Sequence, residues 1–409
     1  MATATSSAMF APTSPDGAAL PVATHRITSI DLLRGIVMII MALDHARDYL
    51  HTTGMTQDPT NMQTTTVWLF LTRFITHFCA PVFVFLAGTS GWLQARRKSK
   101  SELSVFLVTR GLWLIFAEVV LVGFIITFDP GYHLLFLQTI WAIGISMVFL
   151  GIAVHLPFWA VLAMGTAIVL GHNALDFYEQ GKQQFPAWYH FVHRPGPLTV
   201  GDGRAIFVAY PFLSWTGLMF LGYCFGRLYT HCTEQARKKW LLLLGIGLLV
   251  LFVALRASNL YGDRQHWTEQ KNTLFTALSF INVVKYPPSL LYMCITIGPA
   301  LLFLAAAGEH RGRFGRIISV YGSVPFFYYM LHFFLLHLVT MVFYFAHGHS
   351  FAEGMQGYKN AFNFVQPGEG LRLTWVYVIW ISVVVALYWP CRWFSNYKKT
   401  HRQWWLSYL

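Results

Sequence analysis

The sequence predicts an all-α fold, in the form of a polytopic integral membrane protein with about ten transmembrane helices and both termini in the cytoplasm. Hydrophobic residues make up 56% of the 409 residues and charged residues only 11%, whereas about 25% of a soluble domain is charged. The hydrophobic residues occur in blocks of about 20, long enough at ~1.5 Å per helical residue to cross a ~30 Å hydrocarbon core. Such segments must be helices, because each satisfies its own backbone hydrogen bonds in lipid.

Ten segments are expected to span the membrane, and the fifth is short. They are 28–50, 66–94, 103–128, 134–155, 156–171, 205–229, 240–255, 286–307, 317–346 and 373–393. Basic clusters follow the second, sixth, eighth and tenth segments: Arg96, Arg97, Lys98 and Lys100; Arg227, Arg237, Lys238 and Lys239; Arg311, Arg313 and Arg316; Arg392, Lys398, Lys399 and Arg402. The positive-inside rule places all four clusters in the cytoplasm, which agrees with an even number of spans.

Composition divides the chain into three parts. Residues 1–24 are rich in Ala, Thr, Ser and Pro and lack the charged and apolar regions of a signal peptide, so a disordered tail is expected. Residues 25–396 form the transmembrane helical domain, and residues 397–409 form a basic and aromatic cytoplasmic tail. The five cysteines are odd in number and include no C-x-x-C pair, which indicates neither a disulfide framework nor a thiolate metal site.

The formal charge of +12 does not indicate nucleic-acid binding. The basic residues lie in short clusters between apolar segments rather than along one amphipathic face, so they indicate orientation in a bilayer. No pair of histidines lies with an acid on one helical face as a zinc site would need, so no metal is expected. The bilayer itself is the partner that composition predicts.

Two outward connections, 173–204 and 258–285, are much longer than a tight helix connection needs. They contain a mixture of aromatic and imidazole side chains: Trp188, Tyr189, His190, His193, Tyr261, His266 and Trp267. Such rings stack on sugars, but Trp and Tyr also anchor proteins at the membrane interface. Both interpretations stay open at this stage.

The first predicted span carries an unusual number of ionisable residues. Charges at membrane depth are costly, which makes each of them a candidate for function. At 100° per residue, Arg34 and His45 lie about 20° apart on one helical face and ~16 Å apart along the axis. Asp31 and Asp48 fall within about a quadrant of this stripe, whereas Arg47 points elsewhere.

Other spans carry ionisable residues at matching depths. By residue counting, Arg110 lies as deep from the cytoplasmic side as Arg34, and Glu118, His77 and His332 lie near the depth of His45. Further intramembrane polar candidates are Asp44, Arg73, His77, Lys285 and His332. The structural alternatives are snorkelling by the two arginines, pairing of Asp31 with Arg34, and interhelical hydrogen bonding by the histidines.

This arrangement suits acyl transfer from a cytoplasmic thioester to an acceptor presented from outside. Arg34 and Arg110 would hold the phosphates of the donor, because guanidinium groups bind phosphates through two hydrogen bonds, and Asp31 belongs to the same donor site beside Arg34. His45 would act as general base, because histidine changes protonation near neutral pH. Asp48 would orient the imidazole, Glu118 would serve proton transfer at the same depth, and the ~16 Å separation matches the reach of a pantetheine arm.

The stretch Ser29-Ile-Asp-Leu-Leu-Arg34-Gly35 followed by His45 resembles the first span of the family 3 membrane acyltransferases. The wider sequence resembles the bacterial branch of the heparan-α-glucosaminide N-acetyltransferase catalytic-domain family. Five stretches, spread from the first span to the C-terminus, carry this likeness. They are Leu43-Asp-His-Ala-Arg-Asp48, Thr72 to Gly88, Tyr210-Pro-Phe-Leu-Ser-Trp215, Lys285-Tyr-Pro-Pro-Ser289 and Trp404-Trp-Leu-Ser-Tyr408.

The resemblance implies transfer of an acetyl group from cytosolic acetyl-CoA to an amino sugar or hydroxyl on the far side of a bacterial inner membrane. It matches Asp31, Arg34 and Gly35 to the family's opening motif and Arg110 to an arginine of its third span. In the eukaryotic enzymes the catalytic histidine lies slightly later in the span, near the position of His51. Two imidazoles therefore compete as the base, His45 and His51. The acceptor-binding regions do not match, so heparan is not inferred.

A second hypothesis is a proton-coupled transporter or flippase of a small or lipid-linked solute, in which the intramembrane His and Glu residues relay protons. The sequence supports it less, because no internal repeat is visible and Gly/Pro-broken helices do not occur in matched halves. The chain is also compatible with a homodimer. The expected partners are thus the lipid bilayer, acyl-CoA, and a sugar or glycan acceptor.

Overall fold

The structure is a computed structural model that describes residues 28–201, 203–307, 312–357, 361–401 and 403–407. The described part of the chain is 69% helical and has one small sheet, which confirms the predicted helical fold. The expected tail at 1–24 lies outside the described residues. At the other end, helix α18 (Leu373–Thr400) continues past the expected boundary at 396 and is followed by the short 3-10 helix η2 (Trp404–Ser407).

Six helical stretches of the described chain are long and apolar enough to cross a membrane. They are Val67–Ala95, Lys100–Thr127, Glu234–Ser258, Leu290–Ala307, Pro325–Ala346 and Leu373–Thr400. Four further helices occupy the remaining predicted spans: α1 (Thr28–Leu50), α6 (Thr139–Ala153), α7 (Phe158–Gly171) and α10 (Phe212–Phe225). A multi-pass membrane protein is therefore confirmed, and the count of ten crossings stays a prediction.

Two of the long stretches change geometry along their length. The first consists of α2 (Val67–Thr76) and α3 (Cys79–Ala95), with Pro81 in the first turn of α3, where a missing N–H costs no helical hydrogen bond. The second consists of α4 (Lys100–Ala117), a π-helical turn η1 (Glu118–Val122) and α5 (Gly123–Thr127). Single π turns of this kind occur often at functional sites.

The predicted span 317–346 is not one continuous helix. It is divided at Pro325 into α15 (Arg313–Ser323) and α16 (Pro325–Ala346), and the intervening Val324 has a non-helical backbone. Proline disfavours helical geometry in the residue before it and is well suited to the first position of a new helix. The remaining long helices, α12 (Glu234–Ser258) and α14 (Leu290–Ala307), are continuous.

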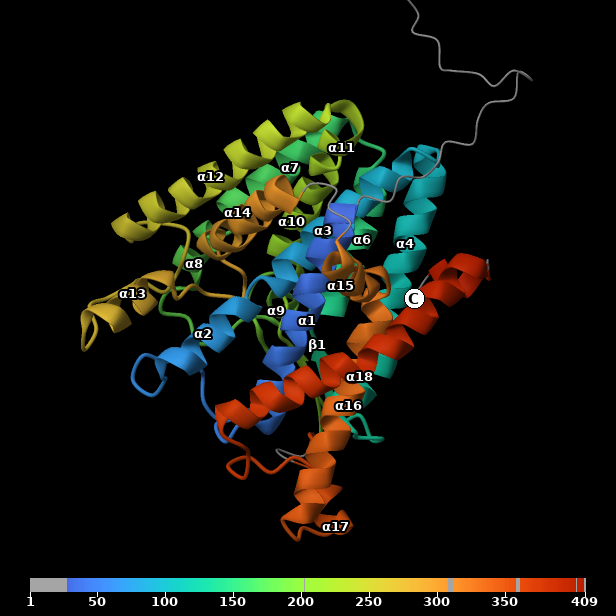
Figure 1. Ribbon diagram of the computed structural model, residues 1–409. Helices are drawn as coiled ribbons and strands as arrows, with labels where there is room; N and C mark the ends of the chain where they lie inside the picture. Colours follow the sequence, from blue (N-terminus) through green and yellow to red (C-terminus); the bar gives the residue numbers. More distant parts are fainter. Residues whose placement is uncertain (1–27, 202, 308–311, 358–360, 402, 408–409) are drawn as a thin grey trace, which may run out of the picture.

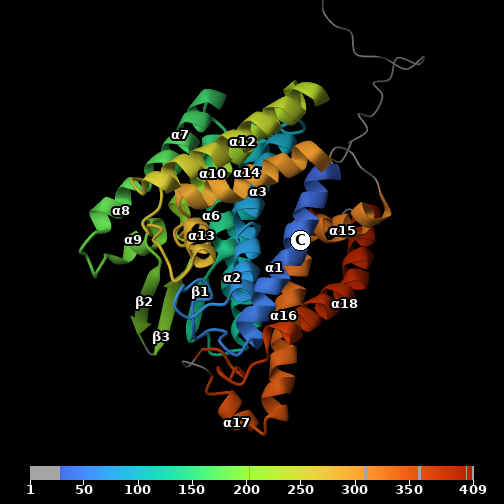
Figure 2. The ribbon, with the colours of Figure 1, turned by 60° about the vertical axis from the view of Figure 1, so that its left-hand side comes forward.

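Three short strands correct the expectation that every element is helical. Strands β1 (Leu134–Leu137), β2 (Gly196–Gly201) and β3 (Arg204–Val208) form a sheet in the order β1-β3-β2, visible together in Figure 2. β1 is parallel to β3, and β2 is antiparallel to it. The residues of β1 and β3 had been assigned to helical spans, because a short apolar run does not distinguish a strand from a helix.

The outer connections also contain short helices. These are α8 (Ala174–Glu179), α9 (Ala187–Val192), α13 (Thr273–Ile281) and α17 (Phe351–Gly354), and α11 (Leu228–His231) follows α10 on the opposite side. In Figure 1, α17 lies at the end of the molecule toward which α1 runs, and α11 lies toward the opposite end.

Helix α1 is the central element of the fold. It contacts α15, α16 and α18 on one side and α2, α3 and α14 on the other, as Figure 1 shows. Glycines permit the closest approaches: a Cβ at Gly35 would meet the carbonyl oxygen of Ile318, and a Cβ at Gly322 would meet that of Asp31. Small residues allow such backbone contact between membrane helices, and here they fix the height of α15 against α1.

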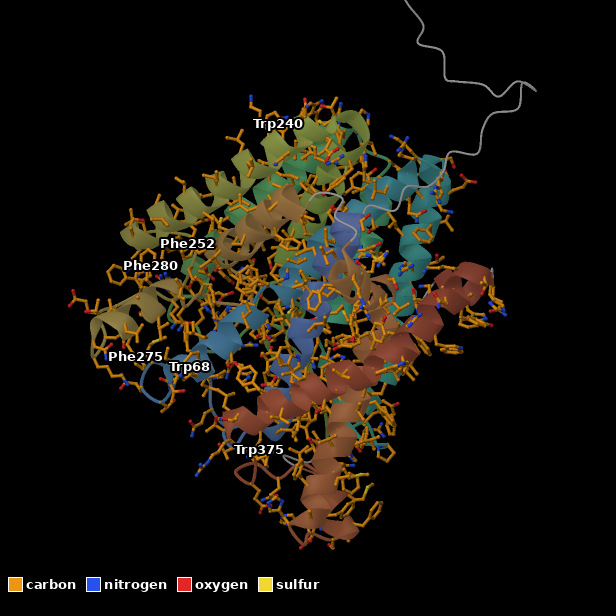
Figure 3. All side chains as sticks on the ribbon, in the orientation of Figure 1. Trp68, Trp240, Phe252, Phe275, Phe280 and Trp375 are labelled. Atoms are coloured by element: carbon orange, nitrogen blue, oxygen red, sulfur yellow. The ribbon has the colours of Figure 1, made fainter. Side chains whose placement is uncertain are left out.

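Large aromatic side chains lie exposed near both ends of the molecule. Trp240 is 47% exposed, and Trp68 and Trp375 are 72% and 58% exposed. Figure 3 shows Trp240 near one end and Trp375 toward the opposite end. Tryptophan is enriched at the two membrane–water interfaces, so these side chains fit the two borders of a bilayer.

Helices α3 and α10 pack through glycine backbones, so we expect Gly222→Ala to destabilise the fold. A Cβ at Gly222 would meet the carbonyl group of Phe85, and overpacking costs about 1–3 kcal/mol. The measurement is the apparent melting temperature of the detergent-purified protein. Gly247→Ala is the matched control, because a Cβ at Gly247 has nothing within 4 Å. Equal melting temperatures for the two variants would contradict the packing argument.

Candidate active site

A cavity of about 790 Å³ lies beside the C-terminal half of α1. Its walls come from α1, α2, α3 and α16, from the loop after α1, and from residues 136–139 and 282–286. Six of the predicted site residues line it: Asp44, His45, Asp48, Arg73, His77 and Lys285. We call it the outer cavity, because the sequence predicts that this half of α1 faces outward.

Asp44 is the centre of a buried charge cluster in this cavity. Its carboxylate accepts a hydrogen bond of 2.7 Å from Arg47 and one from Arg73, and it lies 3.8 Å from the Lys285 Nζ. Asp48 accepts a second hydrogen bond of 2.6 Å from Arg47. The Asp44 cluster, formed by these five residues, holds three cations and two carboxylates. It therefore presents one surplus positive charge to the cavity.

Two imidazoles meet at the wall of the outer cavity. The ring of His45 packs on Phe333 with 3.9 Å between centroids, and the ring centroid of His332 is 5.3 Å away. His332 is fully buried, and its Nδ1 donates to the carbonyl oxygen of Tyr328 at 3.0 Å. The other nitrogen of His332 has no hydrogen-bond partner among the described residues. His332 therefore packs beside His45, and it is not among the described residues that line the cavity.

His77 lies on another wall of the same cavity. The hydroxyl of Tyr292 donates to its carbonyl oxygen at 2.7 Å, and the two rings are 5.4 Å apart. Its Nδ1 atom has no hydrogen-bond partner in the part of the chain that the structure describes. His77 and His45 are thus the two imidazoles of the described chain that line the outer cavity.

A second, inner cavity of about 270 Å³ lies beside the N-terminal half of α1. Arg34, Arg110 and Lys398 line it, and no carboxylate does so among the described residues. Arg34 donates to Asp31 at 3.3 Å and to the Ser90 hydroxyl at 3.2 Å, which fix its direction. The predicted donor-binding arginines, from helices far apart in the sequence, thus face one cationic space.

The two cavities adjoin. Met41, Phe83 and Thr139 line both of them, and these side chains come from α1, α3 and α6. The inner cavity with Arg34 and the outer cavity with His45 therefore lie next to each other along α1. The contact between the cavities is mostly apolar.

The structure separates Glu118 and His51 from the other predicted site residues. Glu118 begins the π turn η1, is 1% exposed, and accepts the backbone N–H of Gln138 at 2.6 Å. It lies behind the cavity wall, because Gln138 lines the outer cavity and Glu118 is not among the described residues that do so. His51 contacts the Thr53 hydroxyl at 2.9 Å and also lies outside this lining.

Asp48 also differs from its expected role. It was expected to orient His45, but its carboxylate binds Arg47 instead. Arg47, expected to point away from the site, is 4% exposed and lines the outer cavity. Counting by 100° places the Cα atoms but not the ends of long side chains, and an arginine reaches across more than one face of a helix.

Sequence reasoning also missed polar residues that only tertiary contacts bring to the outer cavity. Tyr210 and Tyr286 pack edge to face at 5.2 Å, and Arg264 donates to the carbonyl oxygen of Tyr286 at 2.8 Å. Asn282 lines the same wall. The sequence did hold an indication of Tyr210 and Tyr286, because each stands in a stretch that carries the family resemblance, the second of them next to the predicted Lys285.

The aromatic and imidazole side chains of the long connections do not reach the outer cavity in the described chain. Several of them instead surround Glu179, which accepts hydrogen bonds from His193 at 2.7 Å, Tyr189 at 3.1 Å and Arg194 at 2.6 Å. Arg264 lies 3.9 Å from the same carboxylate. Since Arg264 lines the outer cavity, Glu179 links the connection 174–194 to the cavity wall.

The fold and the two adjoining cavities define a multi-pass membrane protein with a polar site in its interior. Residues 26–261, more than half of the chain, match the family described as heparan-alpha-glucosaminide N-acetyltransferase, catalytic. The chain therefore belongs to this family of membrane acetyltransferases, as the motifs around Arg34 predict. None of the curated proteins matches the chain.

Acid is expected to release the connection that Glu179 holds. Burial acts to raise the pKa of Glu179, but hydrogen bonds from His193 and Arg194 outweigh it and lower that pKa to about 2. Burial lowers the pKa of neighbouring His172 to about 3. Both groups bind fewer protons in the folded protein than in the unfolded protein, so a fall in pH favours unfolding. The loss of folding stability begins below pH 6.5, where His172 of the unfolded chain takes up protons, and Glu179 adds to this loss below about pH 4.5.

Hydrogen exchange of residues 187–194, corrected for the intrinsic rate at each pH, measures this loss. We expect Glu179→Gln to exchange rapidly already at pH 7. Glu353→Gln is the control, because Glu353 binds only its own loop through Ser350 among the described residues. Protection that stays constant from pH 7 to pH 3 in the wild-type protein would refute the assignment.

Proposed function

We propose that the protein is an integral-membrane acetyltransferase that moves an acetyl group from cytosolic acetyl-CoA to a sugar or glycan hydroxyl or amine at the periplasmic face of a bacterial inner membrane. One observation carries the proposal: a cationic cavity around Arg34 and Arg110 adjoins an imidazole-lined cavity around His45 along a single helix. Family membership supports acetyl transfer. A donor and an acceptor could thus enter from opposite sides and meet within the protein.

The inner cavity suits the donor. Three cations line it, and guanidinium groups bind phosphate through paired hydrogen bonds, which suits the phosphates of CoA. Met38, Met41 and Phe83 give the same cavity apolar walls, which suit the less polar pantetheine arm. The thioester would then lie near the contact between the two cavities.

His45 is the better candidate for the general base. It lines the outer cavity, whereas His51 lies outside that lining and contacts its own loop. In the proposed step, His45 takes the proton of the acceptor hydroxyl or amine while the acceptor oxygen or nitrogen attacks the thioester carbonyl carbon. The C–S bond breaks, and the departing thiolate receives the proton from His45.

The Asp44 cluster supports the same step electrostatically. Attack on the carbonyl places negative charge on its oxygen, and fixed positive groups in a water-poor site stabilise such charge strongly. The cluster has one surplus positive charge, and Arg73 and Lys285 line the outer cavity. Asp48 would act through Arg47 rather than directly on His45.

We expect His45→Ala to abolish acetyl transfer from acetyl-CoA while the purified protein remains monodisperse. Loss of a positioned general base lowers a rate by about 10²–10⁴-fold. The measurement is release of free CoA thiol with an amino-sugar or glycan acceptor. His51→Ala is the matched control and should keep most of the activity; the reverse pattern would assign the base to His51.

Arg34→Gln and Arg110→Gln should each raise the KM for acetyl-CoA and leave its turnover number less affected. A hydrogen bond to a charged group contributes about 1.5–3 kcal/mol, which corresponds to roughly 10- to 100-fold. Arg97→Gln is the control, because Arg97 is exposed and lines neither described cavity. An unchanged KM in both arginine variants would remove the inner cavity as the donor site.

A proton-coupled transporter or flippase is the second candidate. The adjoining cavities, the two imidazoles that line the outer cavity, and His332 beside His45 are the observations that favour it. Proteoliposomes distinguish the two functions. Solute movement that follows an imposed pH gradient and needs no acetyl-CoA would decide for transport, whereas CoA release without such movement would decide for acetyl transfer.

A further inference from the structure

A third cavity, of about 570 Å³, lies where α3 ends and α4 begins. Its walls also include the turn between α6 and α7 and the residues around α11. We refer to it as the α3–α4 pocket. The turn at 96–100 carries one of the basic clusters that the positive-inside rule places in the cytoplasm.

The rim of the α3–α4 pocket is strongly basic. Arg96, Lys98 and Lys100 all line it, and no carboxylate does so in the described chain. Glu102, the nearest acid in the sequence, has its carboxylate bound to the backbone N–H and hydroxyl of Ser99 at 2.7 and 2.9 Å. Lys100 Nζ donates to the carbonyl oxygen of His155 at 3.1 Å, and Lys98 Nζ lies 5.2 Å from the ring centroid of Phe106. No carboxylate of the described lining neutralises the charge of the rim.

Aromatic side chains and a further cation stand beside this rim. The guanidinium of Arg227 lies 4.6 Å from the ring centroid of Phe158, which lines the pocket. Trp92 packs edge to face against Phe158 at 5.7 Å and against Tyr223 at 5.1 Å, and its indole N–H donates to the Thr230 hydroxyl at 2.9 Å. These contacts hold the wall of the pocket in one arrangement.

The deeper wall of the pocket is apolar. Leu103, Val154 and Val161 line it and are almost completely buried. Next to the opening, Leu156 and Trp159 are 41% and 70% exposed, as expected of side chains that face lipid. A basic rim above an apolar wall complements a molecule with an anionic head and a hydrocarbon tail.

The α3–α4 pocket is separate from the path along α1. It shares no lining residue with the outer or inner cavity among the described residues. Gly91 and Leu107 line the inner cavity, and Tyr223 lines the α3–α4 pocket. A Cβ at Gly91 would lie 3.5 Å from Leu150 and 3.7 Å from both Leu107 and Tyr223, so closely packed side chains separate the pocket from the inner cavity. A thioester bound in this pocket could not reach His45, which argues against a second donor site.

We propose that the α3–α4 pocket binds an anionic phospholipid of the cytoplasmic leaflet. The lipid phosphate binds Arg96, Lys98 and Lys100, and an acyl chain lies along Leu103, Val154 and Val161. Basic pockets between membrane helices on the cytoplasmic side recognise anionic lipid head groups in this way. The inference does not depend on the proposed function.

Native mass spectrometry of the full chain with phosphatidylglycerol or phosphatidylcholine tests the proposal. We expect the wild-type protein to bind phosphatidylglycerol at least tenfold more tightly. The variant Arg96→Gln/Lys98→Gln/Lys100→Gln should lose this preference. The matched control, Arg237→Gln/Lys238→Gln/Lys239→Gln, removes equal charge from residues outside the described lining of the pocket and should keep it. Equal loss in both variants would reduce the effect to net charge and overturn the site.

Competition identifies the kind of ligand. Inorganic phosphate and adenosine 3′,5′-bisphosphate at the lipid's concentration should not displace phosphatidylglycerol. Displacement by phosphate would show a simple anion site, and displacement by the nucleotide would show a nucleotide site; either result overturns the lipid assignment. Monodisperse elution of each variant checks that it is folded.

Discussion

The structure depends on the compensation of charge in the interior of a membrane protein. Asp44 is 6% exposed and is bound by Arg47 of its own helix, Arg73 of α2, and Lys285 of the connection after α13. Loss of one partner from a buried pair leaves an uncompensated charge and costs about 3–5 kcal/mol. The cluster therefore fixes three segments, distant in the sequence, around the wall on which His45 lies.

Local periodicity explains what the sequence could predict. The first span was expected at 28–50, and α1 is described over the same residues, because an apolar helix is determined mainly by neighbouring residues. The same counting placed Arg34 and Arg110 at one depth, and both line the inner cavity. Only spacing within straight helices was needed for these predictions.

Contacts between distant segments explain what the sequence could not predict. Strand β1 pairs with β3 some 70 residues later, and no local pattern reveals such a partner. Depth alone grouped Glu118 with His45, although the π turn and the Gln138 contact hold Glu118 behind the wall. Arg264 reaches the outer cavity from a long connection, where side-chain direction has no simple period.

The contact between the two cavities, at Met41, Phe83 and Thr139, determines how a membrane voltage would be distributed through the protein. In an energised membrane, two cavities that open to opposite sides, as proposed, would carry the potential of each solution inward. Most of the voltage would then fall across these three side chains, over a distance much shorter than the bilayer. Moving one elementary charge through 100 mV changes its energy by about 2.3 kcal/mol. A polar substitution at this point would therefore threaten the proton tightness of the cell membrane before it altered any chemistry.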